Sequence, residues 1–263
     1  LGGKNAMIVL DDVDPVAAAS DAAYACFSSS GQLCVSIERV YVQRGAAEAF
    51  TAAFAQRVGS LTLGSAFDYS TDVGSLTSAA QLARVQAHLD DAVAKGATVV
   101  TGGAHRPDLG PYFFEPTVLT GVTQEMACAA GETFGPLVSV YTVDTEEEAV
   151  IAVNDSEYGL NASVLSRSNA RAQRVAAAID AGSVNINEGY RGSFSTVDAP
   201  MGGVKNSGLG RRNGPEGLLR FVEPVTVARP TGLLQLPRTG KEFGPMVAPM
   251  LLLSRVLKAA RLR

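Results

Sequence analysis

The chain has 263 residues, of which 46% are hydrophobic and 18% are charged, and its formal net charge is -4. This composition is typical of a globular protein that buries one large core or two small ones. Lys and Arg are spread along the chain rather than gathered into the basic surface that a nucleic-acid binder needs, so we expect no nucleic-acid partner.

No apolar run reaches the roughly 18 to 20 residues of a membrane span, and no signal peptide is visible, so we expect a cytoplasmic protein without a membrane span. The cysteines Cys26, Cys34 and Cys128 have no CxxC spacing, which favours a reducing compartment over a disulfide framework. The histidines His88 and His105 are expected on the exposed surface. They are too few for a His-based metal site or a Ser-His-Asp triad, so no metal is predicted.

Short β-branched runs alternate with Ala-rich stretches along the chain. Strands are predicted at residues 7–10, 37–42, 98–101, 136–143, 162–165 and 183–186, and helices at residues 15–28, 46–61, 78–95, 146–154 and 169–179. This alternation predicts an α/β fold with a mainly parallel sheet flanked by helices.

Polar and glycine residues mark several helix ends. Asp14 before a proline predicts an N-cap, and Asp144 with Glu147 after it resembles a capping box. Gly96 and Gly182 stand where a left-handed C-terminal cap requires glycine.

The carboxyl-terminal part of the chain is less regular. The glycine-dense stretch 188–217 is predicted to be a long loop that leads to a final helix and a strand at residues 224–228. Residues 250–263 are predicted to form a basic amphipathic helix, which can lie on a membrane surface or dock on a partner. Docking on its own subunit or on a neighbouring one is the favoured interpretation.

Cys34 is the first candidate for chemistry. It ends the sequence Gly-Gln-Leu-Cys at residues 31–34, after a predicted helix and before a predicted strand that contains Arg39. A thiolate in such a position suits a substrate with a carbonyl carbon, because sulfur attacks readily and leaves again from the resulting thioester. Taken alone, the same cysteine could equally be a small buried hydrophobic residue.

Three further segments accompany the Gly-Gln-Leu-Cys sequence. They are Leu-Gly-Gly-Lys-Asn at residues 1–5, Glu-Thr-Phe-Gly-Pro at residues 132–136 and Pro-Met-Gly-Gly-Val-Lys-Asn-Ser-Gly at residues 200–208. In order and spacing, these segments resemble signatures of the aldehyde dehydrogenase superfamily over roughly residues 1–230. The resemblance implies the catalytic domain of that fold together with an oligomerisation strand.

The resemblance also implies roles for individual residues. Cys34 corresponds to the thiol that attacks the aldehyde to give a thiohemiacetal and then a thioester, and its backbone N–H to half of an oxyanion hole. Glu132 corresponds to the residue that binds the nicotinamide ribose hydroxyls of NAD or NADP. Phe134 corresponds to the aromatic residue beside the nicotinamide ring, and Leu1 and Gly2 to the turn that borders the nicotinamide amide.

The resemblance further divides the chain into domains. Residues 1–202 correspond to the catalytic domain, residues 203–230 to a terminal helix and the oligomerisation strand, and residues 231–263 to an extension. The activating glutamate, the oxyanion-hole asparagine and the cofactor-binding domain of the family would precede Leu1. We therefore expect a piece of a longer protein that is inactive alone and whose intact form is a homodimer or homotetramer.

The substrate is suggested by two segments. Residues 185–189 and 197–203 most resemble those of succinate-semialdehyde dehydrogenases. A distal carboxylate requires a cation or a set of donors, so Arg191, with Ser193 or Ser195, is the candidate site. A solvated role for Arg191 and a different small aldehyde stay open.

Two alternative functions also stay open. The first is an acylating semialdehyde dehydrogenase that passes its acyl group to coenzyme A or phosphate and does not need the hydrolytic glutamate. The second is a non-catalytic remnant that oligomerises with a full-length homologue. The choice between NAD and NADP depends on residues around the adenosine ribose, which the resemblance assigns to the absent domain.

Overall fold

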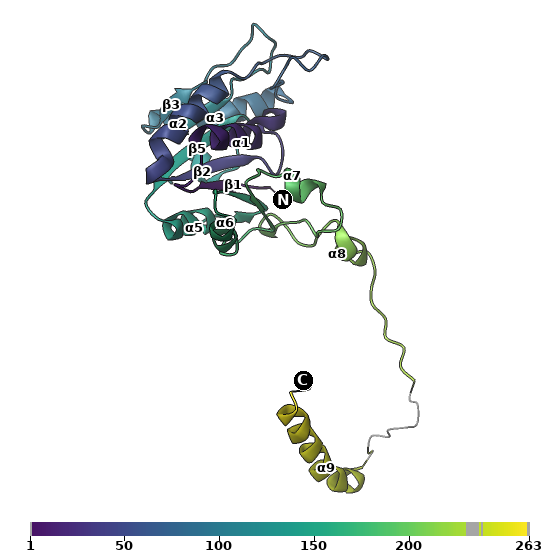
Figure 1. Ribbon diagram of the computed structural model, residues 1–263. Coiled ribbons are helices and arrows are strands. Elements are labelled where there is room, and N and C mark those ends of the chain that lie inside the picture. The colour runs from purple at the N-terminus through teal and green to yellow at the C-terminus, as the bar shows by residue number, and fades with distance from the viewer. Residues whose placement is uncertain (1, 230–236, 238, 262–263) are drawn as a thin grey trace. The chain divides into compact units, whose positions relative to one another are not determined.

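The computed structural model describes residues 2–229, 237 and 239–261 (Figure 1). The chain divides into two units, residues 1–222 and residues 223–263. The first unit contains both sheets and every described candidate site residue.

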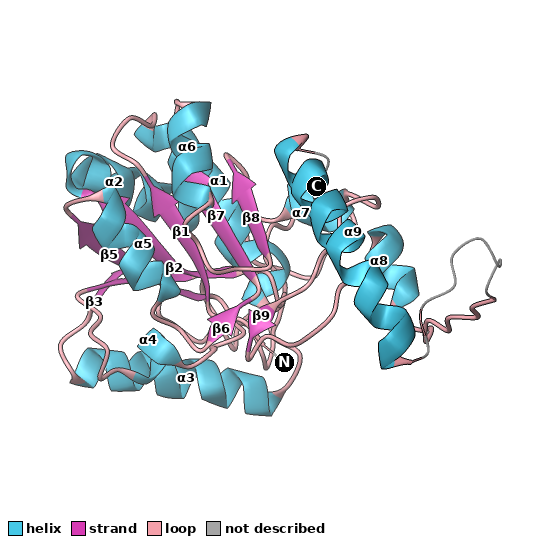
Figure 2. Cartoon of the chain, turned by 90° about the horizontal axis from the view of Figure 1, so that it is seen from below, coloured by secondary structure: helices cyan, strands magenta, loops and turns pink. Residues whose placement is uncertain are grey.

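The first unit is built around a seven-stranded sheet with the strand order β3-β4-β5-β2-β1-β7-β8 (Figure 2). These strands are β1 (Asn5–Val9), β2 (Ile37–Gln43), β3 (Thr98–Thr101), β4 (Thr117–Thr120), β5 (Leu137–Val143), β7 (Asn161–Leu165) and β8 (Ser183–Ile186). All neighbouring pairs are parallel except β3 with β4. A small antiparallel sheet joins β6 (Tyr158–Gly159) to β9 (Val204–Lys205). The predicted α/β fold is thus confirmed.

Helices cover both faces of the large sheet. They are α1 (Pro15–Phe27), the 3-10 helix η1 (Ser28–Gly31), α2 (Arg44–Gly59), α3 (Ala79–Ala94), α4 (Ala127–Ala130), α5 (Glu146–Asn154) and α6 (Asn169–Ala176). Successive side chains of a strand point to opposite faces. In β1, Met7 and Val9 therefore join the core under α1 and α2, whereas Ala6 and Ile8 join the core under α5 and α6 (Figure 1).

The sequence predicts two helix N-caps, at Asp14 and at Asp144. Asp14 caps α1, as predicted, because its side chain accepts backbone hydrogen bonds from the first turn. The prediction of Asp144 as the cap of α5 is wrong by one residue. The Thr145 hydroxyl accepts from the Glu148 N–H at 3.1 Å, and the Glu148 carboxylate accepts from the Asp144 N–H at 2.7 Å. The N-cap is therefore the Thr145 hydroxyl, and the Glu148 carboxylate reaches back to the residue before it.

The two predicted C-terminal glycine caps have different outcomes. Gly96 follows α3 with a φ of +98°, which confirms a left-handed position. The prediction for Gly182 is wrong, because α6 already ends at Ala176 and Gly182 has no left-handed φ. Glycine is needed at position 182 because the backbone of Gly202 lies very close to it. An added Cβ would lie 1.6 Å from the carbonyl oxygen of Gly202.

The stretch 188–217 is not the continuous loop that the sequence predicts. It contains α7 (Arg191–Ser195), β9 and the beginning of α8 (Gly214–Leu219). Residues 224–228, predicted as a strand that pairs between subunits, have no strand conformation in the single chain, so the intersubunit strand stays a prediction. A β-strand needs a neighbour for its ladder of hydrogen bonds, and the described part of the chain gives this segment none.

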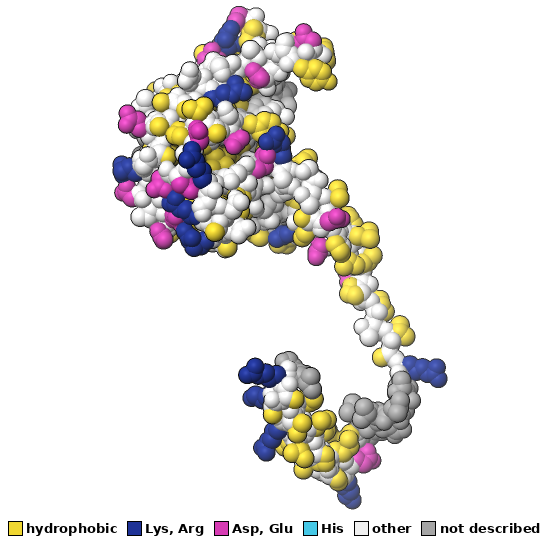
Figure 3. Space-filling model, viewed as in Figure 1, with side chains coloured by type: hydrophobic (Ala, Val, Ile, Leu, Met, Phe, Trp, Pro, Cys, Tyr) yellow, Lys and Arg dark blue, Asp and Glu magenta, His cyan; other side chains and the backbone are white. Residues whose placement is uncertain are grey.

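The second unit contains helix α9 (Gly240–Ala259), which begins well before the predicted residue 250. None of its described residues is buried, and its apolar side chains appear in yellow along the helix in Figure 3. No helix within the described ranges has the length and the apolar character needed to cross a membrane.

Candidate active site

Three segments meet at the edge of the sheet where its central strands begin. Lys4 precedes β1, Cys34 precedes β2 and Phe134 precedes β5. In the sheet, β2 lies between β1 and β5 and is parallel to both. Parallel neighbours begin at the same edge, so residues far apart in the sequence become neighbours there.

Close backbone contact joins the Cys34 segment to the segment of residues 132–136. Gly31 has a φ of +69°, and an added Cβ there would lie 2.3 Å from the carbonyl oxygen of Gly135. Only glycine tolerates both the left-handed conformation and this approach. The glycine of the Gly-Gln-Leu-Cys sequence therefore fixes how closely the two segments pack.

Cys34 differs from the other two cysteines in its accessibility. Cys34 is exposed, whereas Cys26 and Cys128 are buried. Burial raises the pKa of the Cys26 thiol, and burial likewise raises the pKa of Cys128. A neutral, enclosed thiol is a poor nucleophile. Cys34 is thus the accessible thiol of the three, which excludes the alternative that it is a buried hydrophobic residue.

The backbone around Cys34 is held by an asparagine of β1. Asn5 Nδ2 donates to the carbonyl oxygens of Cys34 at 2.9 Å and of Ser36 at 2.7 Å. Asn5 Oδ1 accepts from the N–H of Asn161, at the start of β7, at 3.0 Å. Asn5 itself is buried, so these bonds form away from bulk water.

Glu132 and Gly2 lie together, as the predicted cofactor roles require. The Gly3 N–H donates to Glu132 Oε1 at 2.8 Å. An added Cβ at Gly2 would lie 3.0 Å from Glu132 Oε2. Burial raises the pKa of the Glu132 carboxyl, although its bond from Gly3 acts in the opposite direction. Leu1, the other predicted residue, lies outside the described residues.

Phe134 has an unusual backbone conformation for a large side chain, with a φ of +53°. Its N–H donates to Glu38 Oε1 at 2.9 Å, and the Thr133 N–H donates to Glu38 Oε2 at 3.0 Å. From the other side, Gln81 Nε2 donates to the carbonyl oxygens of Thr133 at 2.8 Å and Phe134 at 2.6 Å. Thr133 and Phe134 thus each have both the backbone N–H and the backbone C=O bonded to a side chain.

Glu38 is paired with Lys4, and sequence reasoning missed both residues. Lys4 Nζ lies 2.5 Å from Glu38 Oε2, and the two side chains are 2% and 5% exposed. The available signal was an acidic residue near the apolar run Val40-Tyr41-Val42 of a predicted strand, because a buried charge requires a partner. The sequence does not reveal that the partner is the lysine of residues 1–5.

His88 is also part of this region, so the prediction that it is exposed is wrong. Its ring Nδ1 lies 3.0 Å from Thr133 Oγ1, and burial lowers the pKa of the imidazole. His88 is half-buried because α3 packs against the segment that contains Thr133. The same prediction is confirmed for His105, which is exposed.

The predicted substrate residues contact neighbouring residues of their own segment, and Arg191 also contacts Tyr24 of α1. Arg191 begins α7, and its guanidinium lies 2.7 Å from Glu188 Oε2 and 4.5 Å from the centre of the Tyr24 ring. The Ser193 hydroxyl donates to the Tyr190 carbonyl at 3.3 Å, and the Ser195 hydroxyl donates to the Arg191 carbonyl at 2.6 Å.

The start of α7 is nevertheless tied to the Cys34 segment. Tyr190 belongs to the buried cluster that contains Val35, the residue after Cys34. Asn161 Nδ2 bridges the two segments by donating to the carbonyl oxygens of Val35 at 3.1 Å and Gly189 at 3.0 Å. Substrate binding by Arg191, Ser193 and Ser195 stays a prediction.

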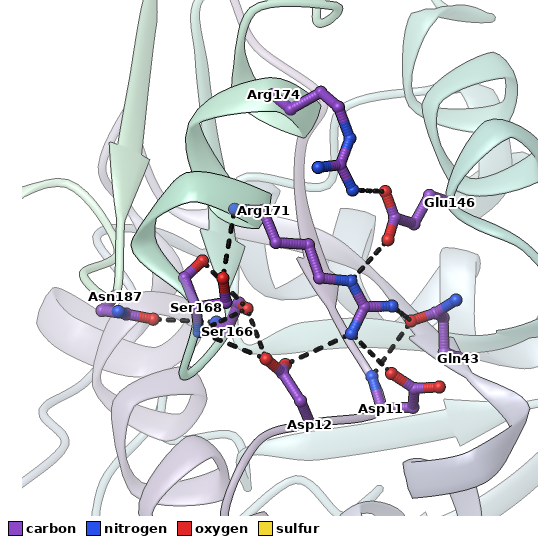
Figure 4. A network of polar contacts seen from close by, with 9 residues as sticks. All are labelled: Asp11, Asp12, Gln43, Glu146, Ser166, Ser168, Arg171, Arg174 and Asn187. Atoms are coloured by element: carbon purple, nitrogen blue, oxygen red, sulfur yellow. Dashed lines mark hydrogen bonds and ion pairs between the residues drawn. The ribbon is translucent and has the colours of Figure 1, made fainter.

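A second polar cluster lies at the opposite ends of the strands (Figure 4). Arg171 of α6 contacts Glu146 Oε1 at 2.5 Å, Asp11 Oδ1 at 2.7 Å and Gln43 Oε1 at 2.9 Å. Asp11 follows β1 and Gln43 ends β2, so this arginine links the carboxyl ends of two strands to the first turn of α5. The cluster is separate from the candidate active site.

The comparisons with known proteins agree with this arrangement. The model of the aldehyde dehydrogenase family matches residues 1–227. The chain therefore belongs to the aldehyde dehydrogenase family, as the sequence resemblance indicates.

Individual relatives show which members of the family the chain is similar to. A Mycobacterium ulcerans protein provisionally named succinate-semialdehyde dehydrogenase [NADP(+)] 2 is 56% identical over 228 residues, which cover 87% of this chain and 44% of the relative. A succinate semialdehyde dehydrogenase of Acinetobacter baylyi is 39% identical over 223 residues, which cover 85% of this chain and 45% of the relative. The chain thus spans less than half the length of these relatives.

Solved structures show the same fold. A Staphylococcus aureus betaine aldehyde dehydrogenase in complex with NAD+ has a TM-score of 0.79 and 39% identity, covering 84% of this chain and 44% of that one. A Mycobacterium tuberculosis aldehyde dehydrogenase complexed with NAD+ has a TM-score of 0.83 and 34% identity, covering 89% and 48%.

Proposed function

We propose that the chain is the catalytic half of an aldehyde dehydrogenase that oxidises succinate semialdehyde to the acid with NADP+ or NAD+. The observation that carries this proposal is the exposed Cys34 thiol, which is anchored through Asn5 and packed beside the segment that contains Glu132 and Phe134. The names of the Mycobacterium ulcerans and Acinetobacter baylyi relatives support the substrate.

The residues present suit a nicotinamide cofactor. The carboxylate of Glu132 is half-buried and can accept hydrogen bonds from the vicinal hydroxyls of a ribose. The ring of Phe134 can pack beside a planar nicotinamide. Gly2 leaves space next to Glu132, since an added Cβ would crowd the carboxylate. When bound, NAD(P)+ supplies the acceptor for the hydride that leaves the substrate carbon.

The Cys34 sulfur performs the covalent chemistry in this proposal. As a thiolate it attacks the aldehyde carbon, and the carbonyl oxygen becomes the oxyanion of a thiohemiacetal. The Cys34 N–H donates a hydrogen bond to that oxyanion. Loss of a hydride from the same carbon restores the C=O bond and leaves a thioester on Cys34. Water then adds to the thioester and releases the carboxylic acid and the thiol.

Arg191 is the proposed partner of the distal carboxylate, with Ser193 and Ser195 as additional donors. In the structure Arg191 pairs with Glu188, so binding a substrate carboxylate requires an exchange of partners. The alternative is that Arg191 only stabilises the start of α7. Arg191→Glu separates the two roles, because loss of a substrate contact raises KM for succinate semialdehyde much more than KM for an uncharged aldehyde.

We also propose a cytoplasmic homodimer or homotetramer for the intact protein. Residues 224–228 include the exposed Val225 and Val227 and have no strand partner within the described chain. An unpaired segment of this kind suits pairing with a sheet edge of a second copy.

The proposed function is tested with a chimaera in which residues 1–228 replace the matching part of the Mycobacterium ulcerans relative. The wild-type chimaera should form NADPH from succinate semialdehyde, and Cys34→Ala should abolish this activity, whereas the chain alone should be inactive. NADPH formation that survives Cys34→Ala would contradict the proposal. Turnover only with coenzyme A or phosphate would favour the acylating alternative, and a folded but inactive chimaera would favour the non-catalytic one.

A further inference from the structure

The carboxylate of Glu38 is the meeting point of three chain segments. It accepts the N–H groups of Thr133 and Phe134 and contacts the Lys4 ammonium. The same Thr133 N–H also lies 3.2 Å from Glu38 Oε1, so both carboxylate oxygens face this peptide. With side-chain exposures of 2% for Lys4 and 5% for Glu38, water contributes little to holding this arrangement.

Phe134, whose N–H donates to Glu38, has a backbone conformation that other contacts must stabilise. A φ of +53° is costly for phenylalanine, because the left-handed region crowds its Cβ against the backbone. Such a conformation persists only when surrounding contacts impose it. The bonds from Thr133 and Phe134 to Glu38, together with those from Gln81, are the described contacts that do so.

Lys4 is itself held firmly in place. Its carbonyl oxygen accepts from Arg39 Nε at 3.0 Å and from Arg39 Nη2 at 2.8 Å. Arg39 and Glu38 are neighbours on β2, so one strand holds both the backbone and the side chain of Lys4. In the same segment, the Gly3 N–H is the donor to Glu132.

We propose that the Lys4–Glu38 ion pair is a positioning device for residues 132–134 and thereby sets the affinity for the nicotinamide cofactor, without setting the reactivity of Cys34. The positioning of the segment rests on the contacts of this chain alone. The effect on cofactor affinity rests, in addition, on the proposed function, because it requires that Glu132 and Phe134 contact the cofactor.

The chemistry of the pair explains why a charged acceptor is needed. A carboxylate offers two acceptor oxygens, and hydrogen bonds to an ionised acceptor are stronger than those between neutral groups. In Glu38→Gln one oxygen is replaced by an NH2 group, which donates and would face either an N–H group or the Lys4 ammonium. Removing Lys4 instead leaves an uncompensated carboxylate in a buried position.

The first experiment uses the chain as it is and follows amide hydrogen exchange at single residues. Glu38→Gln should accelerate exchange at the Thr133 and Phe134 amides by roughly ten- to a hundredfold, the range expected when bonds to a charged acceptor are lost. Arg171→Met is the matched control, because it breaks ion pairs at the opposite ends of the strands. It should leave these two amides unchanged relative to the amides of the central strands, which report any loss of global stability. Unchanged exchange in a folded Glu38→Gln variant overturns the proposal.

Two companion variants keep the test decisive if Glu38→Gln does not fold. Glu38→Asp retains the charge and both oxygens, so it should restore most of the protection. The double variant Lys4→Met/Glu38→Gln removes both charges and should fold while still exchanging rapidly at residues 133 and 134. In every folded variant, alkylation of Cys34 by iodoacetamide should proceed at the wild-type rate. A parallel change in alkylation would show that the pair acts on the nucleophile, against the proposal.

The second experiment uses the chimaera described above. Glu38→Gln should raise KM for NADP+ by roughly tenfold or more with a much smaller change in kcat, and Glu38→Asp should recover most of the loss. A wild-type chimaera without activity would count against the proposed function, while amide exchange would still decide the positioning role. Faster exchange with an unchanged KM for NADP+ would overturn the link to the cofactor.

Discussion

The side-chain amide of Asn5 donates a hydrogen bond of 2.9 Å to the carbonyl oxygen of Cys34. The same amide donates to Ser36, so one buried side chain holds the backbone on both sides of residue 35. Cys34, the proposed nucleophile, is therefore positioned through its backbone, and its side chain is left accessible.

Replacing Asn5 by alanine should destabilise the chain and slow alkylation of Cys34. The change leaves the carbonyl groups of Cys34 and Ser36 without their donor, which costs about 1–3 kcal/mol for a buried unsatisfied group. Urea unfolding and the rate of iodoacetamide alkylation measure the two effects. Gln86→Ala is the control, because within the described residues the Gln86 side chain bonds only Asp90, in an exposed position on α3. An alkylation rate in Asn5→Ala equal to that of the control would refute the positioning role of Asn5.

Gly31→Ala should destabilise the chain more than Gly96→Ala. Both glycines have a left-handed φ, which costs roughly 1–2 kcal/mol for alanine. At Gly96 an added Cβ meets nothing within 4 Å, whereas at Gly31 it would lie 2.3 Å from the Gly135 carbonyl oxygen. The difference between the two variants in unfolding free energy therefore measures the close contact of the two segments. Equal losses of unfolding free energy in the two variants would show that the backbone near Gly31 and Gly135 moves apart at no cost.

Arg171→Met should lower the stability without affecting Cys34. Arg171 is paired with Asp11 and Glu146 (Figure 4), and removing one partner of a partly buried cluster leaves like charges together. We expect a loss of about 1–3 kcal/mol in urea unfolding, the range for common single substitutions that break such contacts. A normal alkylation rate of Cys34 in the folded variant is the second expected result. An altered rate would show that the two ends of the sheet are coupled.

The same cluster should make stability depend on pH. Burial alone would raise the pKa of Asp12 and of Glu146, but hydrogen bonds and the Arg171 charge leave both below their ordinary values of 3.8 and 4.5. A lowered folded-state pKa means that the stabilisation is present above the ordinary value and is lost as the pH falls through the folded-state value. The free energy of unfolding, measured from pH 6 down to about pH 3, should thus fall less in Arg171→Met than in the wild type. An equal fall of the unfolding free energy in both proteins would contradict the role of Arg171 in lowering these two pKa values.

Glu132→Gln should raise the unfolding midpoint at neutral pH while weakening cofactor binding in the chimaera. Burial raises the pKa of Glu132, so ionisation above its ordinary value of 4.5 disfavours the folded state. Glutamine is neutral and can still accept the Gly3 N–H. A substitution that removes a partly buried charge can increase stability and still weaken function, if that charge is there to bind a ligand. Thermal unfolding at pH 7 and KM for NADP+ measure the two effects, and a lower midpoint would contradict the first.

The sequence predicts the fold well because the strands β1, β2, β5 and β7 are short, largely buried runs rich in apolar and β-branched residues that alternate with helices, which is typical of an α/β sheet. It does not predict β4, because these four residues follow a loop rather than a helix, so the alternation of strands and helices does not mark them. Position 182 needs glycine for a contact with Gly202, and no local pattern reveals such a contact.

The candidate site is predicted in part, for a similar reason. The motifs indicate Cys34, Glu132 and Phe134, because these residues stand in recognisable local sequences. Lys4 and Glu38 are 34 positions apart, and only strand pairing brings them within 2.5 Å. Their connection to residues 132–134 depends on β5 lying beside β2. Contacts made across the sheet are thus the part that local sequence patterns cannot supply.

The most direct measurement is the mass of the Cys34-containing peptide from the chimaera after brief reaction with succinate semialdehyde and NADP+, followed by acid quenching. The proposed chemistry predicts that this peptide gains one succinyl group as a thioester, that Cys34→Ala removes the adduct, and that peptides with Cys26 or Cys128 stay unmodified. Turnover without any adduct on Cys34, or an adduct on another cysteine, would contradict the central claim that Cys34 is the nucleophile.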